Sequence, residues 1–164
     1  MNQQASLLET RMVDISEKVP TARMARARGE IQMQTSTLQA VLAGDTPKGD
    51  VITIAQIAGI QGAKQCAQWI PLCHPLLLNG VDVTIQADAS RSCLVVEATV
   101  KITGKTGVEM EALCAVNAAL LTLYDMCKGL DPAMEINGIH LCEKTGGRHG
   151  HYQRSEMLMQ EPQA

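Results

Sequence analysis

The chain has 164 residues, of which 46% are hydrophobic and 19% are charged, and this balance is typical of a globular protein. The length predicts a single domain over residues 1–164, large enough to bury its own core, with an ordered part over about residues 11–150 and frayed ends. A formal net charge of −3 argues against non-specific nucleic-acid binding, because that binding depends on a cationic surface.

The first half of the chain predicts one strand and two helices. Loose alternation of side chains over residues 20–33 favours a strand, although the Ala and Arg residues there would suit a helix equally well. Thr35 or Ser36 can cap a short helix that runs through residue 43, and Gly44 ends it. Asp50 is a suitable N-cap for a longer helix over residues 51–69, whose apolar residues keep helical spacing.

The second half predicts a hairpin, a long helix and a last strand. Polar and apolar residues alternate over residues 81–87 and 93–102, and the sequence DASRS between them forms turns readily. A helix over residues 108–128 has one apolar stripe and ends at Gly129, and a strand over residues 134–143 follows it. This order predicts an α+β, ferredoxin-like fold, an antiparallel sheet with helices packed on one face.

The six cysteines and the apolar runs indicate a cytoplasmic protein without a membrane segment. The cysteines form no C-x-x-C pair and most lie in apolar runs, which favours buried free thiols over a disulfide framework. The N-terminal sequence has no charged start followed by an apolar stretch, as a secretory signal would. The longest apolar run, residues 112–124, contains Asn117 and is too short to span a bilayer.

The segment TGKTGVEMEAL, residues 103–113, places Gly-Lys-Thr between a predicted strand and a predicted helix, as a phosphate-binding loop would. The motif G-x-x-x-x-G-K-[ST] needs a glycine five residues before Gly104, where Thr99 lies in the middle of a strand. The predicted antiparallel sheet also lacks the parallel crossover that contains such a loop. The segment is therefore not a nucleotide-triphosphate loop.

Acidic residues lie at both ends of the helix that follows. Glu109 and Glu111 fall in its first turn, where carboxylates commonly stabilise the helix dipole. Because residues i and i+2 point about 200° apart, the two carboxylates could instead approach a ligand from two sides. At the other end, Asp125 and Lys128 can form an ordinary surface ion pair, or a carboxylate and amine arranged for proton transfer.

Histidines and loop cations are further candidates for a site. His74 lies in the stiff, proline-bounded segment IPLCHPL, but a lone histidine is more often structural, and a metal site with Cys73 would need more ligands. His149 and His151 suggest weak, adventitious metal binding. Several loop-placed cations could hold a polyphosphate if they converge: Lys48, Lys64, Lys105, Lys144 and Arg148.

Seven segments in order resemble one family. They are MVDIS (12–16), KGDV (48–51), AGIQGAK (58–64), IPLCHPL (70–76), TGKTGVEMEAL (103–113), LYDMCK (123–128) and KTGG (144–147). Together they are similar to the cyclic pyranopterin monophosphate synthases, the molybdenum-cofactor accessory protein C family. The similarity covers about residues 11–150, nearly the whole chain.

The resemblance implies an enzyme that converts (8S)-3′,8-cyclo-7,8-dihydroguanosine 5′-triphosphate to cyclic pyranopterin monophosphate and diphosphate, a phosphorus–oxygen lyase activity. It also implies a ferredoxin-like homohexamer, a trimer of dimers, with each active site at a subunit interface. No cofactor is implied, although Mg²⁺ can accompany the triphosphate, and neither nucleic acid nor membrane is an expected partner.

The family's functional residues can be carried over one by one onto the matching segments of this sequence. By resemblance, Asp125 would be an acid–base residue with Lys128 as its partner, and Lys48 would be a second catalytic cation. The positions that would contact substrate are Leu72, Cys73, His74, Glu109, Met110, Glu111, Lys64 and Lys144, and no metal ligand is implied. The rival hypothesis is a ferredoxin-like regulatory module that binds a nucleotide without catalysis, but it does not explain why these residues occur together.

Overall fold

The computed structural model describes residues 10–147 and 150–155. The expected fraying of the two ends and the candidates Arg148 and His149 lie outside these residues. The elements are β1 (Thr21–Gln32), α1 (Thr35–Ala43), α2 (Val51–Lys64), α3 (Cys66–Trp69), β2 (Gly80–Asp88), β3 (Cys93–Gly104), α4 (Glu109–Cys127), β4 (Glu135–Thr145) and β5 (Tyr152–Gln153).

The strands form one antiparallel sheet in the order β2-β3-β1-β4-β5. β1 is central and pairs antiparallel with both β3 and β4. β2 pairs with the far side of β3, and the short β5 pairs with the far side of β4. One strand therefore separates β1 from β2 and β3 from β4, which is the split β-α-β arrangement. The predicted ferredoxin-like fold is confirmed.

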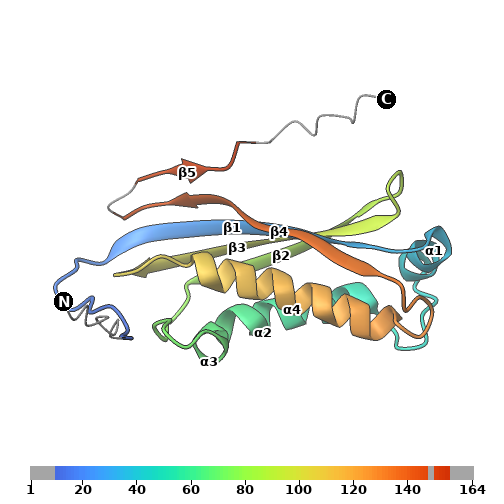
Figure 1. Ribbon diagram of the computed structural model, residues 1–164, viewed down its shortest axis with the longest axis horizontal. Coiled ribbons are helices and arrows are strands. Elements are labelled where there is room, and N and C mark those ends of the chain that lie inside the picture. Colours follow the sequence, from blue (N-terminus) through green and yellow to red (C-terminus); the bar gives the residue numbers. More distant parts are fainter. Residues whose placement is uncertain (1–9, 148–149, 156–164) are drawn as a thin grey trace, which may run out of the picture.

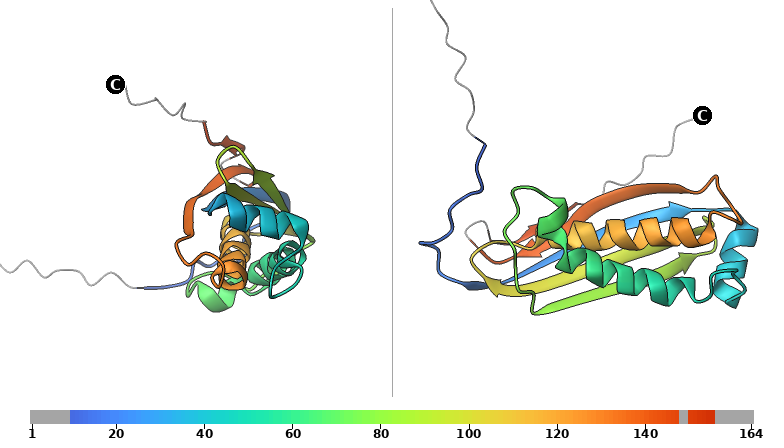
Figure 2. Two further views of the ribbon diagram at one scale, coloured as in Figure 1. Left: turned by 90° about the vertical axis from the view of Figure 1, so that its right-hand side faces the viewer. Right: turned by 90° about the horizontal axis from the view of Figure 1, so that it is seen from below.

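The helices cover one face of this sheet. α2 and α4 lie side by side across it, and α1 lies at the end where β1 finishes (Figures 1 and 2). The opposite face is polar: Arg26 on the central strand pairs with Glu97 at 3.0 Å and with Glu143 at 3.2 Å. The sheet can face water there, because its charged side chains are paired across strands.

The core lies between the sheet and α4. Alternate residues of β1 and β3, among them Ile31 and Val96, are fully buried and pack with Leu120 of α4. Gly29 of β1 lets α4 approach closely, since a Cβ atom at that position would lie 2.8 Å from Leu120 Cδ1. Aliphatic and small residues thus fill the space that aromatic residues occupy in many domains.

α4 is longer than the apolar run that the sequence shows at residues 112–124. By length and composition alone, the helix Glu109–Cys127 could cross a membrane. In the structure, 61% of its most apolar window is buried against the rest of the chain. The core helix of a globular domain passes the same test, and the packing of α4 on the sheet identifies it as one.

Three features differ from prediction. α1 begins at Thr35 with Gln34 as its N-cap and no side-chain cap, so the prediction that Thr35 or Ser36 caps it is wrong. The single helix predicted over residues 51–69 is wrong, because α2 ends at Lys64 and Gln65 leaves the helical conformation (φ −102°, ψ 9°) before α3 begins. Gln is a good helix former, so the helix propensity of Gln65 does not account for this break. β5 was not predicted, since its two residues carry no pattern and are held by pairing with β4.

Candidate active site

The predicted site residues gather at the two ends of α4. Asp125 lies near its carboxyl end, whereas Glu109 and Glu111 lie in its first turn. With a rise of 1.5 Å per residue, Glu109 and Asp125 are separated by about 24 Å along the helix axis. Within one chain they therefore belong to two separate groups of residues.

At the carboxyl end, Asp125 is held between two ammonium groups. Its Oδ1 atom is 2.7 Å from Lys128 Nζ, and its Oδ2 atom is 2.8 Å from Lys48 Nζ. Lys48 also donates to the backbone oxygen of Asp125 at 3.0 Å. A tight turn positions Lys48: the Gly49 amide donates to Thr46 O, and Gly49 takes the left-handed conformation (φ +85°) that glycine permits.

The charges in this triad set its protonation state. The hydrogen bonds from Lys128 and Lys48 lower the pKa of Asp125 to about 2, and Asp125 in turn raises the pKa of Lys128. At neutral pH Asp125 is therefore ionised and Lys128 is a protonated, exposed donor. Since all three side chains are about half exposed, a ligand can reach them directly.

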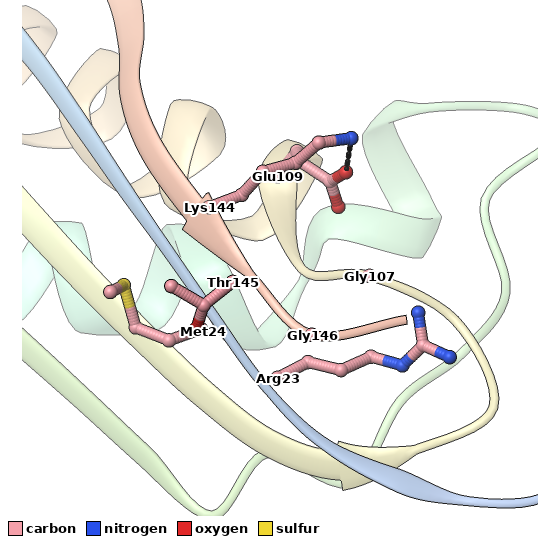
Figure 3. Close-up of a pocket in the computed structure, with 7 residues that line it drawn as sticks. All are labelled: Arg23, Met24, Gly107, Glu109, Lys144, Thr145 and Gly146. Carbon is pink, nitrogen blue, oxygen red and sulfur yellow. Dashed lines mark hydrogen bonds and ion pairs between the residues drawn. The ribbon is translucent and has the colours of Figure 1, made fainter. Parts of the chain in front are cut away.

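At the amino end of α4, a hollow of about 170 Å³ is bordered by two cations and two glycines. Figure 3 shows the Lys144–Glu109 pair, 2.7 Å between Nζ and Oε1, on one side and the Arg23 guanidinium on the other, with Gly107 and Gly146 between them. Burial would raise the pKa of Glu109, but the hydrogen bond from Lys144, a backbone hydrogen bond and the charges of Lys144 and Arg23 together lower it. Arg23 donates from Nε to Gly104 O at 3.0 Å, which aims it along this rim.

A second hollow of about 140 Å³ lies beside the same helix end and is lined by Lys64, Cys66, His74 and Glu111. Glu111 is only 4% exposed, and burial raises the pKa of its carboxyl group. The Nε2 atom of His74 is 2.8 Å from the backbone oxygen of Val13. This hollow therefore combines a buried carboxyl group of raised pKa, an imidazole and an amine.

The structure thus brings Lys48, Asp125 and Lys128 together at one end of α4. At the other end lie the candidates Lys64, His74, Glu109, Glu111 and Lys144. The remaining candidates border this second end: Leu72 is exposed and Cys73 half-buried in the loop after α3, and Met110 is half-buried in the first turn of α4. Among the described residues, no three His, Cys, Asp or Glu side chains form a metal-binding group.

Arg23 was not among the residues that the sequence marked. In the sequence it is one polar residue of an alternating strand, like its neighbours. It lies near the Gly104 turn only because β1 pairs with β3, with Arg23 opposite Ile102. Lys105, in contrast, was a candidate phosphate ligand because of its Gly-Lys-Thr motif. In the structure its Nζ atom donates to Ser16 O at 2.8 Å. Neither contact has a local sequence signal.

The sequence model of the MoaC family matches residues 12–147. The chain belongs to this family. The match covers all seven segments and every residue that the resemblance assigned to catalysis or substrate binding, so the resemblance is confirmed.

Named relatives of this MoaC-family chain are similar over nearly its whole length. A cyclic pyranopterin monophosphate synthase from Chloroflexus aggregans is 53% identical over 146 residues, 89% of this chain and 88% of that protein. Another, from a Roseiflexus species, is 55% identical over 142 residues, 87% of this chain and 90% of that protein. A molybdenum cofactor biosynthesis bifunctional protein from Synechococcus elongatus is 54% identical over 143 residues, 87% of this chain but 45% of that longer protein.

Proposed function

We propose that the protein is a cyclic pyranopterin monophosphate synthase, a phosphorus–oxygen lyase of molybdenum cofactor biosynthesis. It converts (8S)-3′,8-cyclo-7,8-dihydroguanosine 5′-triphosphate to cyclic pyranopterin monophosphate and diphosphate. The names of the Chloroflexus and Roseiflexus relatives support this assignment. The observation that carries it is the triad of Lys48, Asp125 and Lys128, which two distant segments of the chain assemble.

The triad suits the proton transfers of this reaction. Opening and re-forming a purine-derived ring requires protons to move on and off nitrogen and oxygen atoms, which positioned acids and bases accelerate. Asp125 raises the pKa of Lys128 and so keeps this amine protonated until the substrate takes its proton. Lys48 balances the charge of Asp125, so the carboxylate stays ionised whichever amine gives up its proton.

The two hollows at the amino end of α4 suit the two ends of the substrate, its phosphate groups and its guanine-like ring. Lys144 and Arg23 border one hollow and can stabilise the charge of the departing diphosphate, with Mg²⁺ travelling on the triphosphate rather than on a protein site. Glu111 in the neighbouring hollow can accept the N–H groups of a guanine-like ring. No resident cofactor is needed for either step.

We also propose that each active site combines two copies of the chain. The separation of about 24 Å along α4 is longer than a nucleoside triphosphate, so one substrate cannot contact both ends of the same helix. Exposed apolar side chains on the helical layer, Ile57 at 57% and Leu121 at 58%, support association with another subunit. A homohexamer built as a trimer of dimers, located in the cytoplasm and independent of nucleic acid and membranes, fits this requirement.

The test is turnover of freshly prepared substrate, followed by diphosphate release and by pterin fluorescence after oxidation. Asp125→Ala and Lys128→Ala should each lower turnover by about 100-fold or more, because each removes a proton-transfer partner. Asp88→Ala is a matched control, since Asp88 also pairs with a cation three residues later, Arg91, at 2.8 Å. This pair lies far from the triad along the chain.

Wild-type rates of diphosphate release in both triad variants would contradict the proposed chemistry. Substrate binding by the wild-type protein without either product would favour the rival function, a ferredoxin-like regulatory module. Normal turnover in Asp88→Ala confirms that losing an exposed ion pair does not by itself abolish activity.

A further inference from the structure

Residues 11–18, which we call the strap, run past the end of the molecule that holds the two hollows (Figure 2). Two side chains from different loops hold its backbone. His74, in the loop between α3 and β2, bonds to Val13 O at 2.8 Å. Lys105, in the loop between β3 and α4, donates to Ser16 O at 2.8 Å. The strap therefore connects the two loops that lead into the hollows.

Polar contacts rather than burial hold the strap in place. Nearly all of its residues are exposed, and Val13 is 63% exposed. Its shape is set internally, because Asp14 Oδ1 accepts from the Ser16 amide at 2.8 Å and from Ser16 Oγ at 2.7 Å. These bonds turn the backbone so that the Val13 and Ser16 carbonyl groups reach their two partners.

The contact with Val13 decides which tautomer His74 adopts. A backbone carbonyl oxygen can only accept a hydrogen bond, so the Nε2 atom of His74 must carry the proton. In the neutral imidazole the Nδ1 atom is then unprotonated and is an acceptor. His74 lines the same hollow as Glu111 and Lys64, where a proton acceptor next to the substrate is useful.

We propose that the strap is a positioning device for His74: it holds the ring as the Nε2–H tautomer, so that Nδ1 accepts a proton or hydrogen bond from the substrate. Lys105 is the second anchor of the strap and not a phosphate ligand. The inference rests on the proposed function, because that function supplies the substrate in this hollow. The Gly-Lys-Thr sequence does not belong to a phosphate-binding loop, and this proposal gives its lysine a different role.

The experiment uses full-length protein labelled with ¹⁵N in its histidine rings, and His74→Gln identifies the signals of His74. The wild-type ring should show a protonated Nε2 and an unprotonated Nδ1. Lys105→Met and Asp14→Ala loosen the strap in different ways, and both should give mixed tautomers and a kcat lowered about tenfold with KM little changed. Lys105→Arg should restore both properties, and the matched control Lys101→Met, an exposed lysine on β3, should change neither.

Three outcomes would overturn the proposal. One is a wild-type His74 protonated on Nδ1, and another is an unchanged tautomer in both strap variants. The third is a Lys105→Met variant whose KM rises while its tautomer stays fixed, since that result identifies Lys105 as a phosphate ligand. The tautomer measurement needs no substrate, so an inactive wild-type protein with the expected tautomer contradicts the proposed function and leaves only the strap's control of the His74 tautomer standing.

Discussion

Asp125 and Glu111 are both carboxylates of α4, yet their surroundings move their pKa values in opposite directions. Two ammonium groups lower the pKa of Asp125, whereas burial raises that of Glu111. Carboxyl groups whose pKa values are separated in this way can take different parts in one acid–base reaction. Asp125 is suited to stabilising positive charge, and Glu111 is suited to holding a proton more tightly than an ordinary carboxyl group.

The raised pKa of Glu111 predicts that Glu111→Gln stabilises the fold at neutral pH. Because the folded-state pKa is above the ordinary value of 4.5, the folded protein binds this proton more tightly than the unfolded chain. Its contribution to stability is complete below pH 4.5 and is lost as the pH rises through the folded-state pKa. Gln cannot ionise, so the thermal midpoint of the variant should exceed that of wild type at neutral pH and approach it at about pH 4.

Glu109→Gln provides the matched control, because Lys144 lowers the pKa of Glu109. Its stabilising contribution is present above the ordinary value of 4.5 and is lost as the pH falls through the folded-state pKa. The thermal midpoint of this variant should therefore lie below that of wild type at neutral pH. Two variants that shift in the same direction at neutral pH would refute the opposite environments assigned to the two residues.

At the scale of elements, regular patterns were predictable and contacts between elements were not. The hairpin of β2 and β3 and the helix α4 follow from alternation and from an apolar stripe, and their observed bounds are close to the predicted ones. The break at Gln65 has no helix-breaking residue to announce it, and β5 is held by pairing with β4. The contact between Asp125 and Lys128 was predictable from their i, i+3 spacing, whereas its catalytic role and the part of Lys48 were inferred only from family resemblance.

The close approach of α2 and α4 predicts a cost for Gly62→Ala. Alanine favours an isolated helix over glycine by about 1 kcal/mol. A Cβ atom at this position would, however, lie 2.5 Å from Ala118 Cβ and 2.8 Å from Cys114 O, which belongs to the backbone of α4 and cannot move aside alone. We expect the cost of overpacking to exceed the gain in helix propensity. The free energy of unfolding, measured by denaturant titration, should therefore fall by about 1–3 kcal/mol.

Gly80→Ala is the control for this prediction, because no atom lies within 4 Å of a Cβ built there. It should leave the free energy of unfolding nearly unchanged. A Gly62→Ala variant more stable than wild type would mean that the two helices separate without cost. Because Gly62 precedes Lys64 and Cys66 by only a few residues, its substitution should also distort the hollow that contains Glu111.

For the whole molecule, the length of α4 forces a choice between two kinds of active site. Either one end of the helix carries the chemistry alone, or two chains meet so that the carboxyl end of one faces the amino end of the other. A two-fold axis generates two such sites at once, since each chain then gives one end to each site. The second arrangement uses the triad and both hollows, and the first leaves one group of residues without a purpose.

Complementation between inactive variants distinguishes these arrangements. Lys128→Ala removes the triad at one end of α4, and Lys144→Ala removes a cation at the other end, so each variant alone should be inactive. In a mixed dimer one site receives both defects and the other receives two intact ends. Co-expression with two affinity tags should therefore restore about a quarter of wild-type turnover per chain if chains assort at random.

Co-expression of Lys128→Ala with Asp125→Ala is the control for complementation, because both substitutions affect the same end of α4 and every mixed site keeps one defect. It should restore nothing. If the Lys128→Ala and Lys144→Ala pair is equally inactive while both tags purify together, each site lies within a single chain. Restored turnover requires two different chains in one site, since neither chain of the pair carries both ends intact.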